Sequence, residues 1–197
     1  MHPVINALGV LDNPNRQLQP SAGDRAEMAY SSTGQNVDAR SLADARAAGL
    51  AAVNITLGHV AGSAEPLAAT LADIAGWDAF IRARPEALRK VLTAADLDAA
   101  RAAGQIGVIY GFQNTEMLGG DAERVAQFAG LGVRVVQLTY NGRNAAGCGA
   151  TVPDDDGLTP FGAEIVERLQ ASALLVDLSH SSEQTCLDAL RIARRPL

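Results

Sequence analysis

Strand-like and helix-like segments alternate along this chain, and the alternation limits the folds that the chain can adopt. The strand-like segments are short apolar runs at residues 4–10, 51–56, 106–112, 133–140 and 174–180. The run Val133–Thr139 is too continuous for a strand with one solvated face, so it fits a parallel strand covered on both faces. Parallel strands joined by helical crossovers predict an α/β fold.

The helical segments between these runs carry recognisable start signals. Thr93 with Asp96, and Ser181 with Gln184, have the spacing of an N-terminal capping pattern. Pro160 after Thr159 suits a first helical turn. The segment 66–83 has apolar residues at helical spacing, which places its tryptophan in the core rather than in a ligand site.

The number of strand and helix units predicts the architecture. Five such units are followed by Arg195–Leu197, where a sixth strand is due. We therefore predict a partial TIM (β/α)8 barrel, comprising about the first five β/α units, as a single domain over residues 1–197. A small doubly wound sheet is the alternative, but no Gly-x-Gly-x-x-Gly motif follows the first strand.

The composition and charge of the chain limit the kinds of molecule that it can bind. The chain has 197 residues, a formal net charge of -6 and no basic patch with interleaved aromatic residues, which argues against nucleic acid and anionic membranes. No run approaches the roughly 20 apolar residues that a membrane-spanning helix needs. The two cysteines, Cys148 and Cys186, form no metal or disulfide motif, so we expect free thiols in a cytoplasmic protein that acts on a small molecule.

Polar residues stand where three of the apolar runs end, which is where α/β barrels place their chemistry. His180 could ligate zinc or shuttle a proton, and a structural, hydrogen-bonded histidine is equally compatible with the pattern. Gln113 is neutral and so a weaker zinc ligand than a carboxylate. Tyr140, with Arg143, could bind a carboxylate or carbonyl group, although the arginine could simply cap its loop. We expect His59 to be an ordinary solvated histidine.

The acidic run Asp154–Asp156 precedes Gly157 and resembles half of a calcium loop. It lacks the alternating ligand spacing and the distal glutamate of an EF-hand. We therefore expect an exposed acidic turn.

Three segments together resemble the membrane (renal) dipeptidase family: Gly157–Val166, Leu175–His180 and Val133–Asn141. Gly111–Thr115 is similar to a bacterial subgroup of that family, and the resemblance runs from about Val4 to the last residue. It implies an amidohydrolase-like (β/α)8 barrel in which two zinc ions activate a bridging water that attacks the peptide bond of a dipeptide.

The resemblance also implies roles for particular residues. His180 matches a metal-ligating histidine of the family, and Gln113 stands where the family has a bridging glutamate. Asp12 is the only carboxylate near the position of the family's first His-x-Asp pair, so it is a replacement ligand. Tyr140 occupies the position of a substrate-polarising histidine, which makes it the catalytic candidate. The remaining ligands are expected beyond Leu197.

The leading hypothesis is therefore a metal-dependent dipeptidase with one or two zinc ions, present here as an incomplete chain. A catalytically degenerate homologue that binds a small molecule or a partner is the alternative. A lyase or isomerase on the same barrel is a third, because a fold does not fix a reaction. We also expect a homodimer, since barrel proteins of this kind often dimerise.

Overall fold

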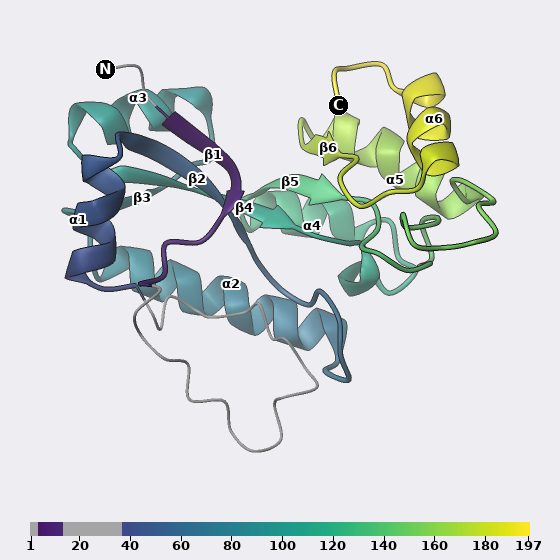
Figure 1. Cartoon of the computed structure of the whole chain (residues 1–197), viewed down its shortest axis with the longest axis horizontal. Helices are drawn as coiled ribbons and strands as arrows, with labels where there is room; N and C mark the ends of the chain where they lie inside the picture. Colours follow the sequence, from purple (N-terminus) through teal and green to yellow (C-terminus); the bar gives the residue numbers. More distant parts are fainter. Residues whose placement is uncertain (1–3, 14–36) are drawn as a thin grey trace. The chain divides into compact units, whose positions relative to one another are not determined.

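A computed structural model describes residues 4–13 and 37–197, which group into two compact units. The first unit comprises Met1–Ala64 and Ala68–Tyr110, and the second comprises Glu65–Leu67 and Gly111–Leu197. The chain passes from the first to the second within strand β4, Ile106–Phe112 (Figure 1). Most of the loop expected between the first strand and Gly34 lies outside the described residues.

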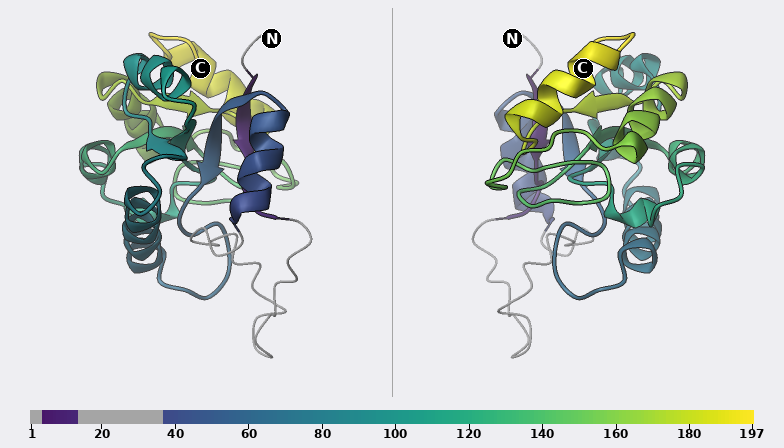
Figure 2. Two further views of the ribbon diagram at one scale, coloured as in Figure 1. Left: turned by 90° about the vertical axis from the view of Figure 1, so that its left-hand side faces the viewer. Right: turned by 90° about the vertical axis from the view of Figure 1, so that its right-hand side faces the viewer.

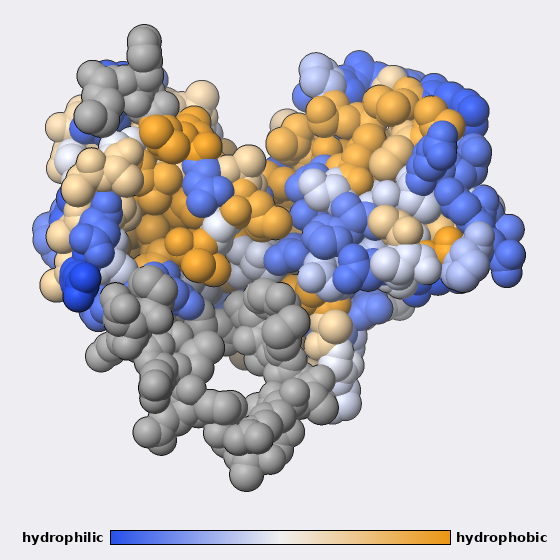
Figure 3. All heavy atoms as spheres, in the orientation of Figure 1, coloured by the Kyte–Doolittle hydropathy of each residue, from blue (hydrophilic) through white to orange (hydrophobic). Residues whose placement is uncertain are grey.

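The first unit holds parallel strands. Its strands are β1 (Val4–Gly9), β2 (Leu50–Thr56), β3 (Leu88–Lys90) and most of β4. β1 pairs with β2 and β3 pairs with β4, both in parallel, and the sheet order runs β1-β2-β4. β2 is buried through its centre, whereas Val4 and Ile5 of β1 are about half exposed. Hydrophobic residues gather on the face of the first unit that Figure 3 shows.

Three helices accompany these strands: α1 (Ala39–Ala47), α2 (Pro66–Arg82) and α3 (Ala94–Ala102). α1 begins after Asp38, whose carboxylate accepts a hydrogen bond from the Ser41 backbone. The predicted capping pattern before α3 is confirmed, because the Asp96 carboxylate accepts from the backbone N–H of Thr93 at 2.8 Å. Trp77 of α2 is buried, as its spacing predicted.

Strand β3 was not predicted. It has only three residues, too few to show an alternating pattern, and two of them are charged. Lys90 of this strand ion-pairs with Asp78 of α2 at 2.7 Å, and the hydroxyl of Tyr110 on β4 donates to the same carboxylate at 2.8 Å. These polar contacts therefore help to hold β3 in the sheet, although the strand has only one apolar residue.

The second unit holds β5 (Val133–Gln137), β6 (Leu175–Asp177) and the helices α4 (Arg124–Gly130), α5 (Pro160–Ala171) and α6 (Glu183–Ile192). β5 and β6 pair in parallel. α5 lies against both α6 and β6, and the neighbouring yellow-green and yellow helices can be followed in both views of Figure 2. An apolar core forms between α4, α5 and β5, with Phe112 and Phe128 in edge-to-face contact at 4.9 Å.

The helix starts of the second unit agree with the sequence in one case and shift in the other. The Thr159 hydroxyl accepts from the Gly162 backbone at 3.0 Å and Pro160 occupies the first turn of α5, which confirms that prediction. α6 begins one residue later than predicted, because the capping residue is Ser182, whose hydroxyl accepts from Thr185.

Parallel pairing of strands that alternate with helices confirms the α/β class. The single domain over 1–197 stays a prediction. Within residues 4–13 and 37–197, no helix combines the length and the apolar character needed to cross a bilayer.

Candidate functional site

The candidate site is built on the two loops that follow β5 and β6 in the second unit. The loop after β5 is held by Asn144, whose side chain donates to the Leu138 carbonyl at 2.9 Å and accepts from the Ala146 backbone at 2.8 Å. Thr115, which follows β4, donates to the same Leu138 carbonyl at 3.0 Å. One internal asparagine therefore shapes the loop that carries Tyr140.

The loop after β6 positions His180 through an unusual backbone conformation. Asp177, at the end of β6, accepts a hydrogen bond from the Ser179 backbone at 2.8 Å, which starts a tight turn. His180 then adopts a φ of 64°, in the left-handed region that few residues other than glycine occupy.

Tyr140 and His180, predicted from separate strand ends, come together in the structure. Their rings lie with centroids 4.4 Å apart at an interplanar angle of 36°. The Nδ1 atom of His180 is 2.8 Å from the side-chain oxygen Oδ1 of Asn141. Both rings are partly exposed, so a ligand can reach them. The contact with Asn141 was not predicted, since nothing in a sequence places that residue against a loop 39 residues later.

Backbone contacts lock the two loops together. The Ala150 N–H donates to the His180 carbonyl at 2.8 Å, and Gly149 bridges to Ser181. The N–H of Ser182 donates to the Cys148 carbonyl at 2.9 Å. The position of the imidazole therefore depends on the loop that carries Tyr140 and Asn141.

Gln113 and Asp12, the other predicted ligands, occupy different units. Gln113 follows β4 in the second unit and is 7% exposed. Asp12 follows β1 in the first unit and is partly buried. Their roles as metal ligands stay predictions.

Two secondary expectations can be compared with the structure directly. Arg143 ion-pairs with Asp156 at 2.8 Å and donates to the Asp154 carbonyl at 2.7 Å, so it braces its own loop. The expectation of a solvated His59 is wrong. That residue is 7% exposed, and its backbone N–H donates to the Thr70 hydroxyl.

The acidic run is more than an exposed turn, because Asp155 reaches the start of α6. Its carboxylate accepts from the Ser182 hydroxyl at 2.6 Å and from the Gln184 backbone at 2.9 Å. The Ser182 bond, followed by the Gln184 bond, lowers the pKa of Asp155 below its ordinary value. Asp188 of α6 behaves similarly, since the Leu158 N–H that it accepts lowers its pKa.

These lowered pKa values predict an acid-sensitive second unit. A carboxyl group whose pKa is depressed by folding stabilises the folded state above its unfolded pKa, and that stability is lost as the pH falls through the folded pKa. We therefore expect the melting temperature to fall below about pH 4, the ordinary range of aspartate. Thermal unfolding followed by circular dichroism from about pH 7 to pH 2 measures the melting temperature. In Asp155→Asn, the melting temperature should fall less steeply as the pH is lowered. An equally steep fall of the melting temperature at low pH in that variant would contradict the prediction.

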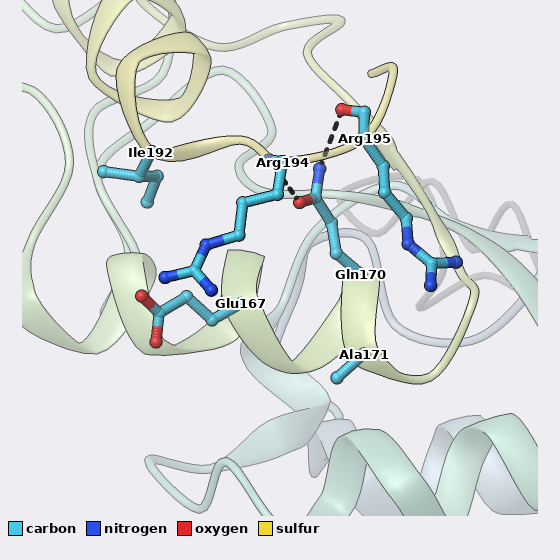
Figure 4. Close-up of a pocket in the computed structure, with 6 residues that line it drawn as sticks. All are labelled: Glu167, Gln170, Ala171, Ile192, Arg194 and Arg195. Carbon is cyan, nitrogen blue, oxygen red and sulfur yellow. Dashed lines mark hydrogen bonds between the residues drawn. The ribbon is translucent and has the colours of Figure 1, made fainter.

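A cavity of about 340 Å³ lies elsewhere in the second unit, between the C-terminal parts of α5 and α6 (Figure 4). The amide of Gln170 crosses it, accepting from the Arg194 backbone at 2.8 Å and donating to the Arg195 carbonyl at 3.0 Å. None of the predicted site residues lines this cavity.

A metal centre needs several converging donors, and a catalytic zinc site commonly has three protein ligands. In the part of the chain that the structure describes, no group of three or more histidine, cysteine, aspartate or glutamate side chains could hold a metal ion. His180 supplies one imidazole nitrogen. The described residues thus do not fit a complete metal centre by themselves.

Comparisons with known proteins agree with one another. A family model described as membrane dipeptidase, peptidase family M19, matches residues 4–197. The dipeptidase tcpJ of Claviceps purpurea is 32% identical over 96 residues, which span 48% of this chain and 23% of that protein.

Solved structures show the same likeness. An amidohydrolase from Pseudomonas aeruginosa has a TM-score of 0.74 at 32% identity, over 79% of this chain and 46% of that one. A metallopeptidase from Rhodobacter sphaeroides, liganded with a phosphinate mimic of the dipeptide L-Ala-D-Ala, has a TM-score of 0.71 at 21% identity, over 79% and 54%. The aligned region thus spans about half of these structures. The likenesses confirm the predicted fold class, a partial α/β barrel.

Proposed function

The chain belongs to the membrane dipeptidase family, peptidase family M19, and on that premise we propose that it is part of a metal-dependent dipeptidase. The substrate would be a dipeptide or a related small amide. The observation that carries the proposal is the family match over residues 4–197, in a chain that also brings His180 and Tyr140 into contact. Relatives that are a named dipeptidase and a structure liganded with a dipeptide mimic support the substrate class.

We assign His180 as a metal ligand, with Gln113 as a contact of the metal or its water and Asp12 as a replacement ligand. Bound zinc would supply Lewis-acid chemistry. The described residues offer too few donors for a complete centre, so such a centre would need ligands from outside them. What this chain supplies is one oriented imidazole and the loops that hold it.

Tyr140 would act as the hydrogen-bond donor to the substrate carbonyl. A phenol donates one O–H, and a donor aimed at the oxygen stabilises the negative charge that develops there during attack. Contact with the His180 ring restricts where the phenol can lie. The ring contact supports this proposal, because it brings Tyr140 and His180 together from separate loops.

The alternative of a non-hydrolytic, small-molecule-binding homologue has two observations in its favour. Gln113 is neutral, and the described residues gather no acidic ligand cluster around His180. Such a protein would bind a small ligand at the loops after β5 and β6 without turnover.

The test measures metal content and hydrolysis of a panel of dipeptides, with and without a chelator. Bound metal with chelator-sensitive cleavage supports the dipeptidase, whereas ligand binding without metal or turnover supports the alternative. His180→Ala should lose both metal and activity. Tyr140→Phe is the matched comparison, since it should retain metal and lose mainly kcat because only the hydroxyl is removed.

Gln113→Glu is expected to raise the affinity for zinc by about 10-fold, equivalent to about 1.4 kcal/mol, because it adds an anionic oxygen ligand. Without metal, the same carboxylate would be buried and uncompensated, so the variant should melt at a lower temperature than the parent. Thermal melts with and without zinc measure both effects.

The matched control is Gln127→Glu, the same change on an exposed position of α4. It should show neither the loss of stability nor the rescue by zinc. If the melting temperature of Gln113→Glu did not change on addition of zinc, the ligand assignment would be contradicted.

We also propose a cytoplasmic location and a homodimer. Both cysteines are free, Cys148 buried and Cys186 partly buried, which supports a reducing compartment. Light scattering coupled to size-exclusion chromatography would determine the oligomeric state.

A further inference from the structure

We propose that Asn141 and Gly142 form a self-modification site, at which the asparagine converts to aspartate and isoaspartate with His180 as the assisting hydrogen-bond donor. The two residues follow Tyr140 in the loop after β5, and Asn141 is the only asparagine of the chain that precedes a glycine. The inference does not depend on the proposed hydrolysis of dipeptides.

The reaction needs only the chain and water. The backbone nitrogen of Gly142 bonds to Cγ of Asn141, and the bond from Cγ to Nδ2 breaks. Nδ2 leaves as ammonia with the proton that the backbone nitrogen gives up. Water then opens the resulting five-membered imide at either carbonyl, which yields aspartate or isoaspartate without oxidation or reduction. Asparagine is among the thermolabile residues of proteins.

The attacking nitrogen is accessible. In the part of the chain that the structure describes, no group accepts a hydrogen bond from the N–H of Gly142, whereas its carbonyl accepts from Gly149 at 2.9 Å. Asn141 and Gly142 are both exposed, so water reaches the amide. A Cβ atom at Gly142 would meet nothing within 4 Å, and glycine itself adds no side chain beside the attacking nitrogen.

The amide carbonyl that is attacked has a hydrogen-bond donor beside it. The Oδ1 atom of Asn141 lies 2.8 Å from Nδ1 of His180. An amide oxygen can only accept a hydrogen bond, so Nδ1 donates. Attack on Cγ places negative charge on Oδ1, and a donor aimed at that oxygen stabilises the charge.

The surrounding backbone holds both the donor and the amide. The carbonyl of His180 accepts from the Ala150 N–H at 2.8 Å, and its ring lies against Tyr140 with centroids 4.4 Å apart. The backbone carbonyl of Asn141 accepts from the Thr151 hydroxyl at 2.7 Å. The donor and the amide are therefore oriented before the attack begins.

Conversion changes the loop at the candidate site. Aspartate places a negative charge beside the imidazole of His180, and isoaspartate lengthens the main chain between Tyr140 and Gly142 by one carbon atom. Gly149 packs against the backbone of Tyr140 and Asn141 so closely that even a Cβ atom there would clash. A longer main chain therefore has to displace these contacts.

Ageing of the full chain in neutral buffer, followed by mass spectrometry, tests the site. Cleavage after arginine releases residues 135–143, in which Asn141 is the only asparagine, and residues 144–168, in which Asn144 is the only one. We expect the first peptide to gain the mass difference between asparagine and aspartate and to separate chromatographically into two forms. Asn144 should stay intact, because alanine follows it and its amide oxygen accepts from the backbone of Ala146.

Three variants separate the attacking nitrogen from the donor. Gly142→Ala crowds the attack at a position that tolerates a Cβ atom, so conversion should slow about 10-fold. His180→Gly suits the φ of 64° and removes the donor, which should slow conversion roughly 3- to 10-fold, the effect of one hydrogen bond. His180→Asn places a side-chain N–H as many bonds from the backbone as Nδ1 and should retain the parent rate.

The same measurement in urea shows whether the fold is responsible. Unfolding separates His180 from Asn141, so the parent and His180→Gly should convert at equal rates, whereas Gly142→Ala should remain slow. An intact Asn141 in the aged, folded parent would overturn the inference, as would equal rates in the folded parent and His180→Gly. Thr151→Val loosens the backbone at Asn141 and leaves the donor in place. Slowing of conversion in this variant to the rate of His180→Gly would attribute the effect to the loop and overturn the role of His180.

Discussion

Replacing Gly149 by alanine is expected to destabilise the second unit by about 2–3 kcal/mol and to separate Tyr140 from His180. The added Cβ would overlap the carbonyl oxygen of Tyr140 and the carbonyl group of Asn141. These are backbone atoms, so they cannot rotate away as the end of a side chain can. Chemical denaturation followed by circular dichroism measures the loss, and the His180 NMR signals report the separation.

Gly142→Ala is the matched control, because it lies in the same loop. A Cβ at Gly142 would meet no atom within 4 Å, and the backbone there does not need glycine. The change should cost less than about 0.5 kcal/mol. If both variants were equally stable, the close approach of Gly149 to the Tyr140 backbone would not be a determinant of the site.

Phe128→Ala is expected to have the largest effect on stability, about 3–5 kcal/mol. The ring is 1% exposed and meets Phe112 edge-to-face at 4.9 Å with an interplanar angle of 89°. Removing it leaves a cavity bordered by side chains of β5 and α5, among them Val136 and Leu169. Since α4 has only seven residues, it depends on this packing to remain helical.

Phe161→Ala serves as the comparison, because Phe161 lies at the second position of α5 and is only partly buried. Its loss should cost about 1–2 kcal/mol. Hydrogen exchange in α4 and β5 should accelerate in Phe128→Ala and change little in Phe161→Ala. The reverse order of stabilities would contradict the assignment of Phe128 as the anchor of this core.

The predictable part of the fold lies in its long, strongly patterned segments. The continuous apolar run of β5 and the proline at the start of α5 have local causes, and both occur where the sequence indicated them. β3 escaped prediction because its three residues are held by the ion pair of Lys90 with Asp78, a contact between separate elements.

The residues of the candidate site also differ in whether the sequence alone predicts them. Tyr140 and His180 could be predicted because each follows an apolar run. Asn141 and Asp155 could not, since their side-chain hydrogen bonds join them to residues 39 and 27 positions further along the chain. The same reasoning failed for His59, because the hydrogen bond that its backbone N–H donates to the Thr70 hydroxyl forms only when α2 packs beside the loop.

The placement of Trp77 has a practical consequence for optical measurements. It is the only tryptophan of the chain, and it is buried in the first unit in edge-to-face contact with Phe80. Tyr140 is the only tyrosine within the residues of the second unit. Emission excited at wavelengths that select tryptophan will therefore report the first unit alone, whereas the absorbance difference between the parent and Tyr140→Phe isolates the phenol of the site from the other tyrosines. The two chromophores make it possible to ask, in one sample, whether ligand binding at the site changes the rest of the chain.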